Sequence, residues 1–175
     1  MEIGEPDFPT AEPIVAAGQQ ALAEGRTRYT AAAGLPELRQ AISDHYRERY
    51  GVEIPVRRIL ITPGASGALQ LATAALINPG DRVLLADPGY PCNRHFVRLV
   101  EGQAIGVPVG PETGYQLTAE LVERHWDQRT TAVLLASPAN PTGTVITPEA
   151  LAAIITMIEA RGGRLIMDEI YHGLI

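Results

Sequence analysis

The stretch RLIMDEIY, residues 164–171, begins as an apolar run and ends in acidic and phenolic side chains. Residues 164–168 have the composition of a short buried strand, and Asp168 stands at its end. A carboxylate that leaves a buried strand loses hydration unless it meets a cation or several donors. A cationic ligand would satisfy Asp168, and a helix N-cap is the rival explanation. If the chain turns helically here, Tyr171 projects to the same side as Asp168, whereas Glu169 points elsewhere.

Outward from this stretch, short apolar strands alternate with helical patterns. Strands are predicted at residues 58–62, 82–86, 104–109, 131–136 and 164–168. Helices are predicted at residues 10–25, 35–51, 67–77, 92–102, 117–126 and 147–163. This alternation is typical of an α/β fold with a mostly parallel sheet and helices on both faces.

Some elements carry more detailed signals. The helix at 67–77 has no polar face, which predicts that it is buried. Pro108 predicts that the strand at 104–109 lies at an edge or ends irregularly, because proline cannot donate to a ladder. Thr10 and Thr147 are the expected N-caps of their helices.

Ligands of such sheets bind at the carboxyl ends of the strands, so the residues that follow each strand are candidates for function. Gly64, Ala65 and Ser66 follow the first predicted strand and lead into a helix. Small residues and free N–H groups at a helix start suit a phosphate. An ordinary tight turn with Ser66 as N-cap explains the same residues.

Two further strand ends carry distinctive polar or aromatic groups. Tyr90, in DPGYP, follows the second strand and could stack on a flat ring, although it could equally cover the edge of the core. Asn140, in SPANPTG, is fixed by two prolines and a glycine, which suits one directed hydrogen bond. A structural turn is the alternative there. Taken together, the strand ends describe a flat, cationic, phosphorylated aromatic ligand.

Composition limits the possible functions. The 175 residues carry a net charge of −6 with scattered arginines, which argues against a nucleic-acid partner. No apolar run approaches the length of a membrane span, and Met1 is followed by acidic and proline residues rather than by a signal sequence. Cys92 is the only cysteine, so no disulfide framework or cysteine metal cluster is expected. We therefore expect a cytoplasmic protein without a metal site.

The chain resembles the class I/II aminotransferases, which are pyridoxal phosphate (PLP) enzymes of fold type I. The resemblance spans nearly the whole chain and rests on motifs in family order: GEPDFPT, GRTRYTAAAGLPELRQAI, ITPGASGALQLA, PGDRVLLADPGYP, SPANPTG and LIMDEIY. It implies a transfer of an amino group between an L-amino acid and a 2-oxo acid.

The resemblance also implies roles for single residues. Asp168 corresponds to the acid that pairs with the pyridinium nitrogen of the cofactor and keeps it protonated. Asn140 and Tyr171 correspond to the partners of the 3-oxygen, and Asn140 also lies where substrate binds. Asp168 and Tyr171 are the expected catalytic residues present in this chain.

Other matched positions concern the phosphate, the ring and the substrate. Gly64, Ala65 and Ser66 fall where the family wraps the phosphate, and Tyr90 falls where an aromatic ring stacks on the cofactor. Tyr29 resembles a tyrosine that reaches the phosphate of the neighbouring subunit, which implies a homodimer with shared active sites. Gly4 resembles a glycine near the substrate carboxylate.

The chain departs from the family pattern in one respect. All 14 of its basic residues are arginine, so the lysine to which the family attaches PLP is absent. In the family that lysine, and the arginine that binds the substrate carboxylate, come after the DEIY motif. We therefore expect a fragment, inactive alone, with residues 1–12 as an N-terminal arm or small-domain remnant and residues 13–175 as the first half of the large domain.

Two alternatives share the same motifs. A PLP-dependent lyase of this fold would keep the same cofactor residues. A PLP-binding sensor domain of a transcription regulator would keep them without turnover.

Overall fold

The computed structural model describes residues 8–174, which form two compact units divided between Ile61 and Thr62. The assignment of residues 1–12 to an arm stays a prediction. In the described part of the chain, no helix has both the length and the apolar character needed to cross a membrane.

The first unit contains two helices and a short 3-10 turn: α1 (Glu12–Ala23), α2 (Pro36–Tyr50) and η1 (Val56–Arg58). Helix α2 starts with a proline and ends at Gly51, whose φ of 68° lets its N–H bond back to the carbonyl of Arg47. These are the predicted bounds. Helix α1 begins later than expected, with Ala11 rather than Thr10 at its N-cap and no side-chain cap among the described residues.

Side chains of α2 hold the segment that follows it. Arg39 donates from Nε to the carbonyl of Ile59 at 2.8 Å and from Nη2 to that of Val56 at 2.6 Å. Ser43 Oγ donates to the carbonyl of Ile54 at 2.6 Å. The strand predicted at 58–62 is wrong, because these residues form no β-ladder, and the Ile59 carbonyl among them is bound by the Arg39 side chain.

The second unit contains a four-stranded parallel sheet in the order β2-β1-β3-β4. Its strands are β1 (Arg82–Asp87), β2 (Gln103–Pro108), β3 (Thr130–Ala136) and β4 (Arg164–Asp168). The helical elements between them are α3 (Gly64–Leu76), α4 (Asn93–Leu99), η2 (Pro111–Thr113), α5 (Ala119–His125) and α6 (Pro148–Ala160). Within the described sheet β2 lies at an edge, as Pro108 predicted, and Ala136 pairs with Asp168 at the ends of β3 and β4.

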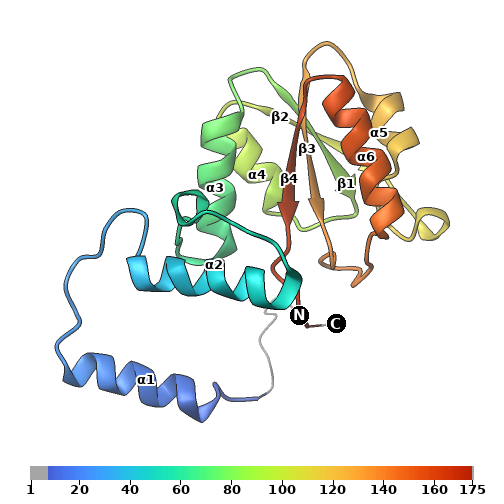
Figure 1. The fold of residues 1–175 in the computed structure, drawn as a ribbon. Coiled ribbons are helices and arrows are strands. Elements are labelled where there is room, and N and C mark those ends of the chain that lie inside the picture. Colours follow the sequence, from blue (N-terminus) through green and yellow to red (C-terminus); the bar gives the residue numbers. More distant parts are fainter. Residues whose placement is uncertain (1–7, 175) are drawn as a thin grey trace. The chain divides into compact units, whose positions relative to one another are not determined.

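Helices cover both faces of the sheet, α3 and α4 on one and α5 and α6 on the other (Figure 1). Successive side chains of a strand point to opposite faces of the sheet, so alternate residues belong to two different apolar clusters. Val133 and Leu135 of β3 pack with Ile154 of α6, whereas Leu134 packs with Val97 of α4. The predicted fold class, a mostly parallel sheet between two helical layers, is confirmed.

Helix α3 differs from its prediction in two ways. It begins at Gly64, three residues earlier than expected, and only Leu69 and Thr73 are buried. Leu71 is 55% exposed, so the prediction of a fully buried helix is wrong. A helix that packs on a sheet through one face leaves its other face uncovered, whatever its composition.

Candidate cofactor-binding site

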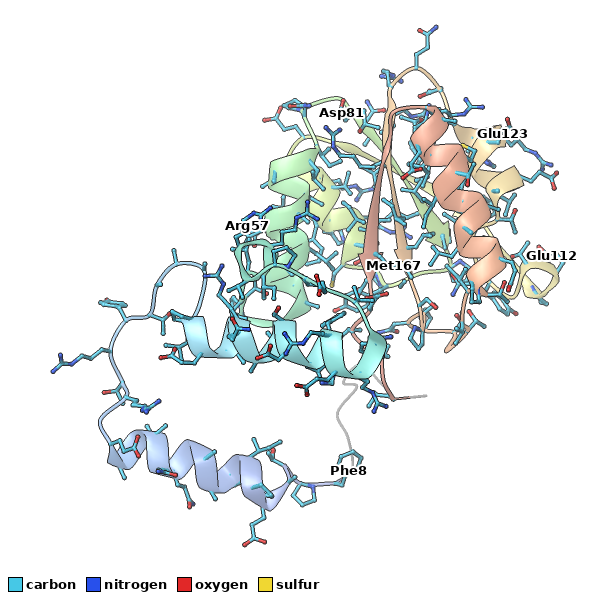
Figure 2. The ribbon with its side chains drawn as sticks, viewed as in Figure 1. Phe8, Arg57, Asp81, Glu112, Glu123 and Met167 are labelled. Atoms are coloured by element: carbon cyan, nitrogen blue, oxygen red, sulfur yellow. The ribbon has the colours of Figure 1, made fainter. Side chains whose placement is uncertain are left out.

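The carboxyl ends of the parallel strands all lie at the same end of the sheet, which is called the carboxyl edge below to distinguish it from the outer strands (Figure 1). Met167, next to Asp168, lies toward this edge, whereas Asp81, just before β1, lies at the opposite edge (Figure 2). Helix α3 runs opposite to the strands, so its first turn faces the same edge as their carboxyl ends. The loops predicted to carry function therefore gather at one end of the second unit.

The loop after β3 is closed by its own backbone. The N–H of Ala139 donates to the carbonyl of Thr144 at 2.9 Å, and the N–H of Gly143 donates to the carbonyl of Ala139 at 2.7 Å. Ser137 Oγ accepts from the N–H of Ile146 at 3.0 Å. The peptide bonds Ser137–Pro138 and Asn140–Pro141 are both cis. Asn140 thus stands on a short loop whose two ends are joined.

Asn140 meets Tyr171 in the structure. Its Nδ2 donates to Tyr171 Oη at 3.5 Å, the long limit of a hydrogen bond. The same loop is joined to β4, because the N–H of Ser137 donates to the carbonyl of Asp168 at 3.1 Å. The structure therefore brings Asn140, Tyr171 and the end of β4 together.

Asp168 is half-buried at the end of β4. Its Oδ1 accepts from the N–H of Ile170 at 3.1 Å, which caps a turn rather than an α-helix. Within residues 8–174 it forms no ion pair with an arginine or histidine. A half-buried carboxylate without a cationic partner fits a ligand that brings a positive charge. Glu169 is exposed.

Tyr90 is half-buried in the loop after β1. A hydrogen bond with the Cys92 thiol is the main factor that raises the pKa of Tyr90, followed by the charge of Cys92, burial, and the charges of Tyr171 and Asp168. Gly89 is required beside Tyr90, since a Cβ there would lie 2.6 Å from the carbonyl oxygen of Ala86.

The first turn of α3 contains Gly64, Ala65 and Ser66. The N-cap is Pro63, so the alternative in which Ser66 caps the helix is wrong. Among the described residues no side chain caps this start, and the N–H of Gly64 donates to the carbonyl of Thr62 at 2.9 Å. An uncapped helix start with a glycine at φ 73° suits an anion.

Two predicted site residues do not belong to the described second unit. Tyr29 belongs to the first unit and its side chain is fully exposed. Gly4 lies outside the described residues. Their roles stay predictions.

A cavity beside Tyr90 and Asn140 reveals residues that the sequence patterns did not mark. Its lining includes Asn93, Arg94 and Gln116. Asn93 is buried and its Oδ1 has no hydrogen-bond partner among the described residues. Asn93 stands among the charged and polar residues Arg94 and His95, so no local pattern marks it, and none marks Gln116.

These groups could hold one flat phosphorylated ring. A carboxylate, an amide paired with a phenol, an aromatic ring and an anion-binding helix start lie at the same edge. Among residues 8–174, no group of histidine, cysteine, aspartate or glutamate is arranged to hold a metal ion. The chemistry of this donor set is compatible with PLP.

The fold is that of an α/β domain with a candidate ligand site at the carboxyl ends of its strands. The family model for aminotransferase class I and II matches residues 1–175, and the chain belongs to this family.

The similar curated proteins are named as aminotransferases. The chain is 43% identical over 175 residues to the valine–pyruvate aminotransferase of Mycobacterium tuberculosis, of which it covers 45%. It is 39% identical to a probable aspartate/prephenate aminotransferase of Thermus aquaticus, of which it covers 46%. In both matches the whole of this chain is covered.

Solved structures agree with these matches. An aminotransferase from Mycobacterium tuberculosis superposes with a TM-score of 0.93 at 43% identity, over 99% of this chain and 47% of that one. The aspartate aminotransferase of Thermus thermophilus with maleate gives 0.91 at 35% identity, over 95% and 44%. The chain thus spans less than half the length of the relatives that it matches.

Proposed function

We propose that this chain supplies the PLP-binding half of an aminotransferase that transfers an amino group between an L-amino acid and a 2-oxo acid. One observation carries the proposal. Asn140 and Tyr171, 31 residues apart in sequence, are in contact, and a backbone hydrogen bond joins the Asn140 loop to Asp168. A structural turn at SPANPTG would not require this meeting of polar groups.

PLP, when bound, supplies an electron sink for the charge left on the substrate carbon after its proton is removed. Asp168 would hold the proton on the ring nitrogen through a charge-assisted hydrogen bond, which keeps that sink effective. The Asn140 amide and the Tyr171 hydroxyl would donate hydrogen bonds to the 3-oxygen and favour its ionised form.

The remaining predicted residues fit the other parts of the cofactor and the substrate. The N–H groups of Ala65 and Ser66 would bind the phosphate, Gly64 would let it approach the backbone closely, and Tyr90 would stack on the ring. Tyr29 would reach the phosphate in a neighbouring copy of the chain, in a homodimer with shared sites.

Gly4 would lie near the substrate carboxylate, and Asn140 would also contact the substrate. Both assignments rest on the match of GEPDFPT and SPANPTG to the family pattern.

Turnover needs groups that these 175 residues do not contain. There is no lysine in the sequence to bond the cofactor covalently or to move the substrate proton. The chain is therefore expected to bind PLP without covalent attachment to a side chain and without transaminase activity of its own.

The aminotransferase function is preferred over the lyase and sensor alternatives. The relatives from Mycobacterium tuberculosis and Thermus aquaticus are both named as aminotransferases, and neither is named as a lyase or a regulator. The substrates in their names differ, so the amino acid used is a separate question.

A titration of this chain with PLP, followed by the absorbance of the bound cofactor, tests the proposal. Asp168→Asn keeps the shape of the side chain and removes its charge. Hydrogen bonds to charged groups contribute about 1.5–3 kcal/mol, so the affinity is expected to fall roughly 10- to 100-fold.

Glu169→Gln is the matched control, because it removes a charge from the adjacent exposed position. It is expected to leave the affinity unchanged. Equal losses in both variants, or no binding by the unaltered chain, would contradict the proposed role of Asp168.

A further inference from the structure

Gln116 is a buried polar residue that the proposed cofactor contacts leave unexplained. It follows η2 and precedes α5, and only 7% of its surface is exposed. It lines the same cavity as Asn140 and Tyr90. A buried amide is costly unless its hydrogen bonds are made, so its partners show its role.

The Gln116 amide binds both ends of the loop that carries Asn140. Its Nε2 donates to the carbonyl of Ala136, the last residue of β3, at 3.2 Å. It also donates to the carbonyl of Thr144 at 3.0 Å and to Thr144 Oγ1 at 3.2 Å. One amide group therefore joins the two ends of residues 136–144.

The Thr144 carbonyl is shared with the loop itself, because it also accepts from the N–H of Ala139. Thr144 Oγ1 in turn bonds to Thr142 Oγ1 at 2.9 Å. Removal of the Gln116 amide would leave the carbonyls of Ala136 and Thr144 with fewer donors at a half-buried position. The loop backbone beneath Asn140 would lose its support.

We propose that Gln116 is a positioning residue, whose amide holds the Ala136–Thr144 loop so that Asn140 is aimed at the 3-oxygen of PLP. This role rests on the proposed function, because it assigns Gln116 to the orientation of a cofactor ligand. The proposed effect of Gln116 is exerted through the loop that its amide binds.

The test replaces the amide by an apolar side chain of similar length, Gln116→Met. Gln103→Met is the matched control, since Gln103 is exposed at the start of β2, at the end of the strand away from the site. Both variants and the unaltered chain are saturated with PLP, and the visible absorbance is followed against pH to give the pKa of the bound 3-hydroxyl group.

We expect Gln116→Met to raise this pKa by about half a unit to one unit, a threefold to tenfold loss of acidity, because Asn140 donates less well to the ionised oxygen. Gln103→Met should leave the pKa unchanged. A merely structural role would lower the affinity for PLP without moving the pKa measured at saturation, and that result would overturn the proposal.

A double variant shows whether the effect passes through Asn140. In an Asn140→Ala background, Gln116→Met should produce no further shift of the pKa. The same shift in both backgrounds would overturn the proposed route. If Gln116→Met does not fold, Gln116→Glu, which keeps the shape but loses the amide donors, enters the same titrations with the same two outcomes.

A measurement without PLP separates this proposal from the proposed function. Amide hydrogen exchange of Ala139 and Gly143 is expected to be faster in Gln116→Met than in Gln103→Met, because both N–H groups close the loop. Unchanged exchange would overturn the positioning role. If the unaltered chain fails to bind PLP, the proposed function fails while the exchange result still decides the role of Gln116 in the loop.

Discussion

The packing of α6 on the sheet yields a prediction whose size follows from burial. Ile154 has 0% exposure and lies in the cluster formed by α5, α6 and one face of the sheet. Ile155, the next residue of the same helix, is only half-buried. The pair Ile154→Ala and Ile155→Ala therefore compares the same chemical change at two depths of one helix.

The expected cost of Ile154→Ala combines transfer and cavity contributions. The three lost carbons contribute about 2.4 kcal/mol at ~0.8 kcal/mol each, and the cavity brings the loss in the free energy of unfolding to about 3–4 kcal/mol. Ile155→Ala should cost about 1 kcal/mol, because roughly half of the side chain is already hydrated. The change in helix propensity is common to both variants and cancels.

The assay is unfolding in urea followed by the fluorescence of Trp126, the one tryptophan of the sequence, which packs against this cluster. The transition midpoint should fall further for Ile154→Ala, with an unchanged slope. The difference of about 2–3 kcal/mol corresponds to roughly 8–12 °C in thermal midpoint at ~4 °C per kcal/mol. Equal midpoints for the two variants would refute the packing of α6 on the sheet through Ile154.

Three further predictions concern single contacts. In Gly163→Ala the new Cβ would overlap the Trp126 ring, so we expect a loss of about 1–3 kcal/mol in urea and a shifted emission spectrum. Burial tends to raise the pKa of Asp127, but hydrogen bonds from Thr130 and the Arg129 N–H and the charge of Arg82 outweigh it, so the pKa lies below 3.8. Because the folded-state pKa of Asp127 is lowered, its ionised form stabilises the folded chain above pH ~4, and this stability is lost as the pH falls through the folded-state pKa. Asp127→Asn should therefore make the free energy of unfolding less dependent on pH below pH ~4. An unchanged dependence would show that Asp127 does not contribute. Ser137→Ala removes the acceptor of the N–H of Ile146, which is a buried residue. The free energy of unfolding in urea should fall by about 1–3 kcal/mol, and PLP should bind less tightly. An unchanged PLP affinity would show that this hydrogen bond does not support the site.

Local signals were sufficient for most of the fold. The strands at 82–86, 131–136 and 164–168 could be predicted because helices cover both faces of the sheet. A strand that is buried on both faces has a continuous run of apolar residues, and turn residues mark its ends. Thr147 was predicted as an N-cap and its Oγ1 accepts from Ala150. Residues 58–62 have the same composition as a strand but find no partner strand among the described residues, and Arg39 binds the Ile59 carbonyl instead. No local pattern indicates whether a partner strand is present.

In the candidate site, too, some residues could be predicted from local sequence and others could not. Asn140 and Tyr90 stand in the loops that follow strands and Asp168 is the last residue of one, which is where a topological rule predicts ligands. Gln116 follows a 3-10 turn, and its partners lie 20 and 28 residues further along the chain. Its amide is recognisable only after the loop and the cavity have been placed in space.

The hydrogen bond from the Ser137 N–H to the Asp168 carbonyl has a consequence for how this site can change over evolution. It fixes the spacing between the Asn140 loop and the acidic strand end through backbone atoms alone, and every residue except proline can supply those atoms. Side chains at the edge can therefore be exchanged one at a time while the frame that spaces them persists. Such a frame allows relatives to alter what they recognise without first rebuilding where the recognising groups stand.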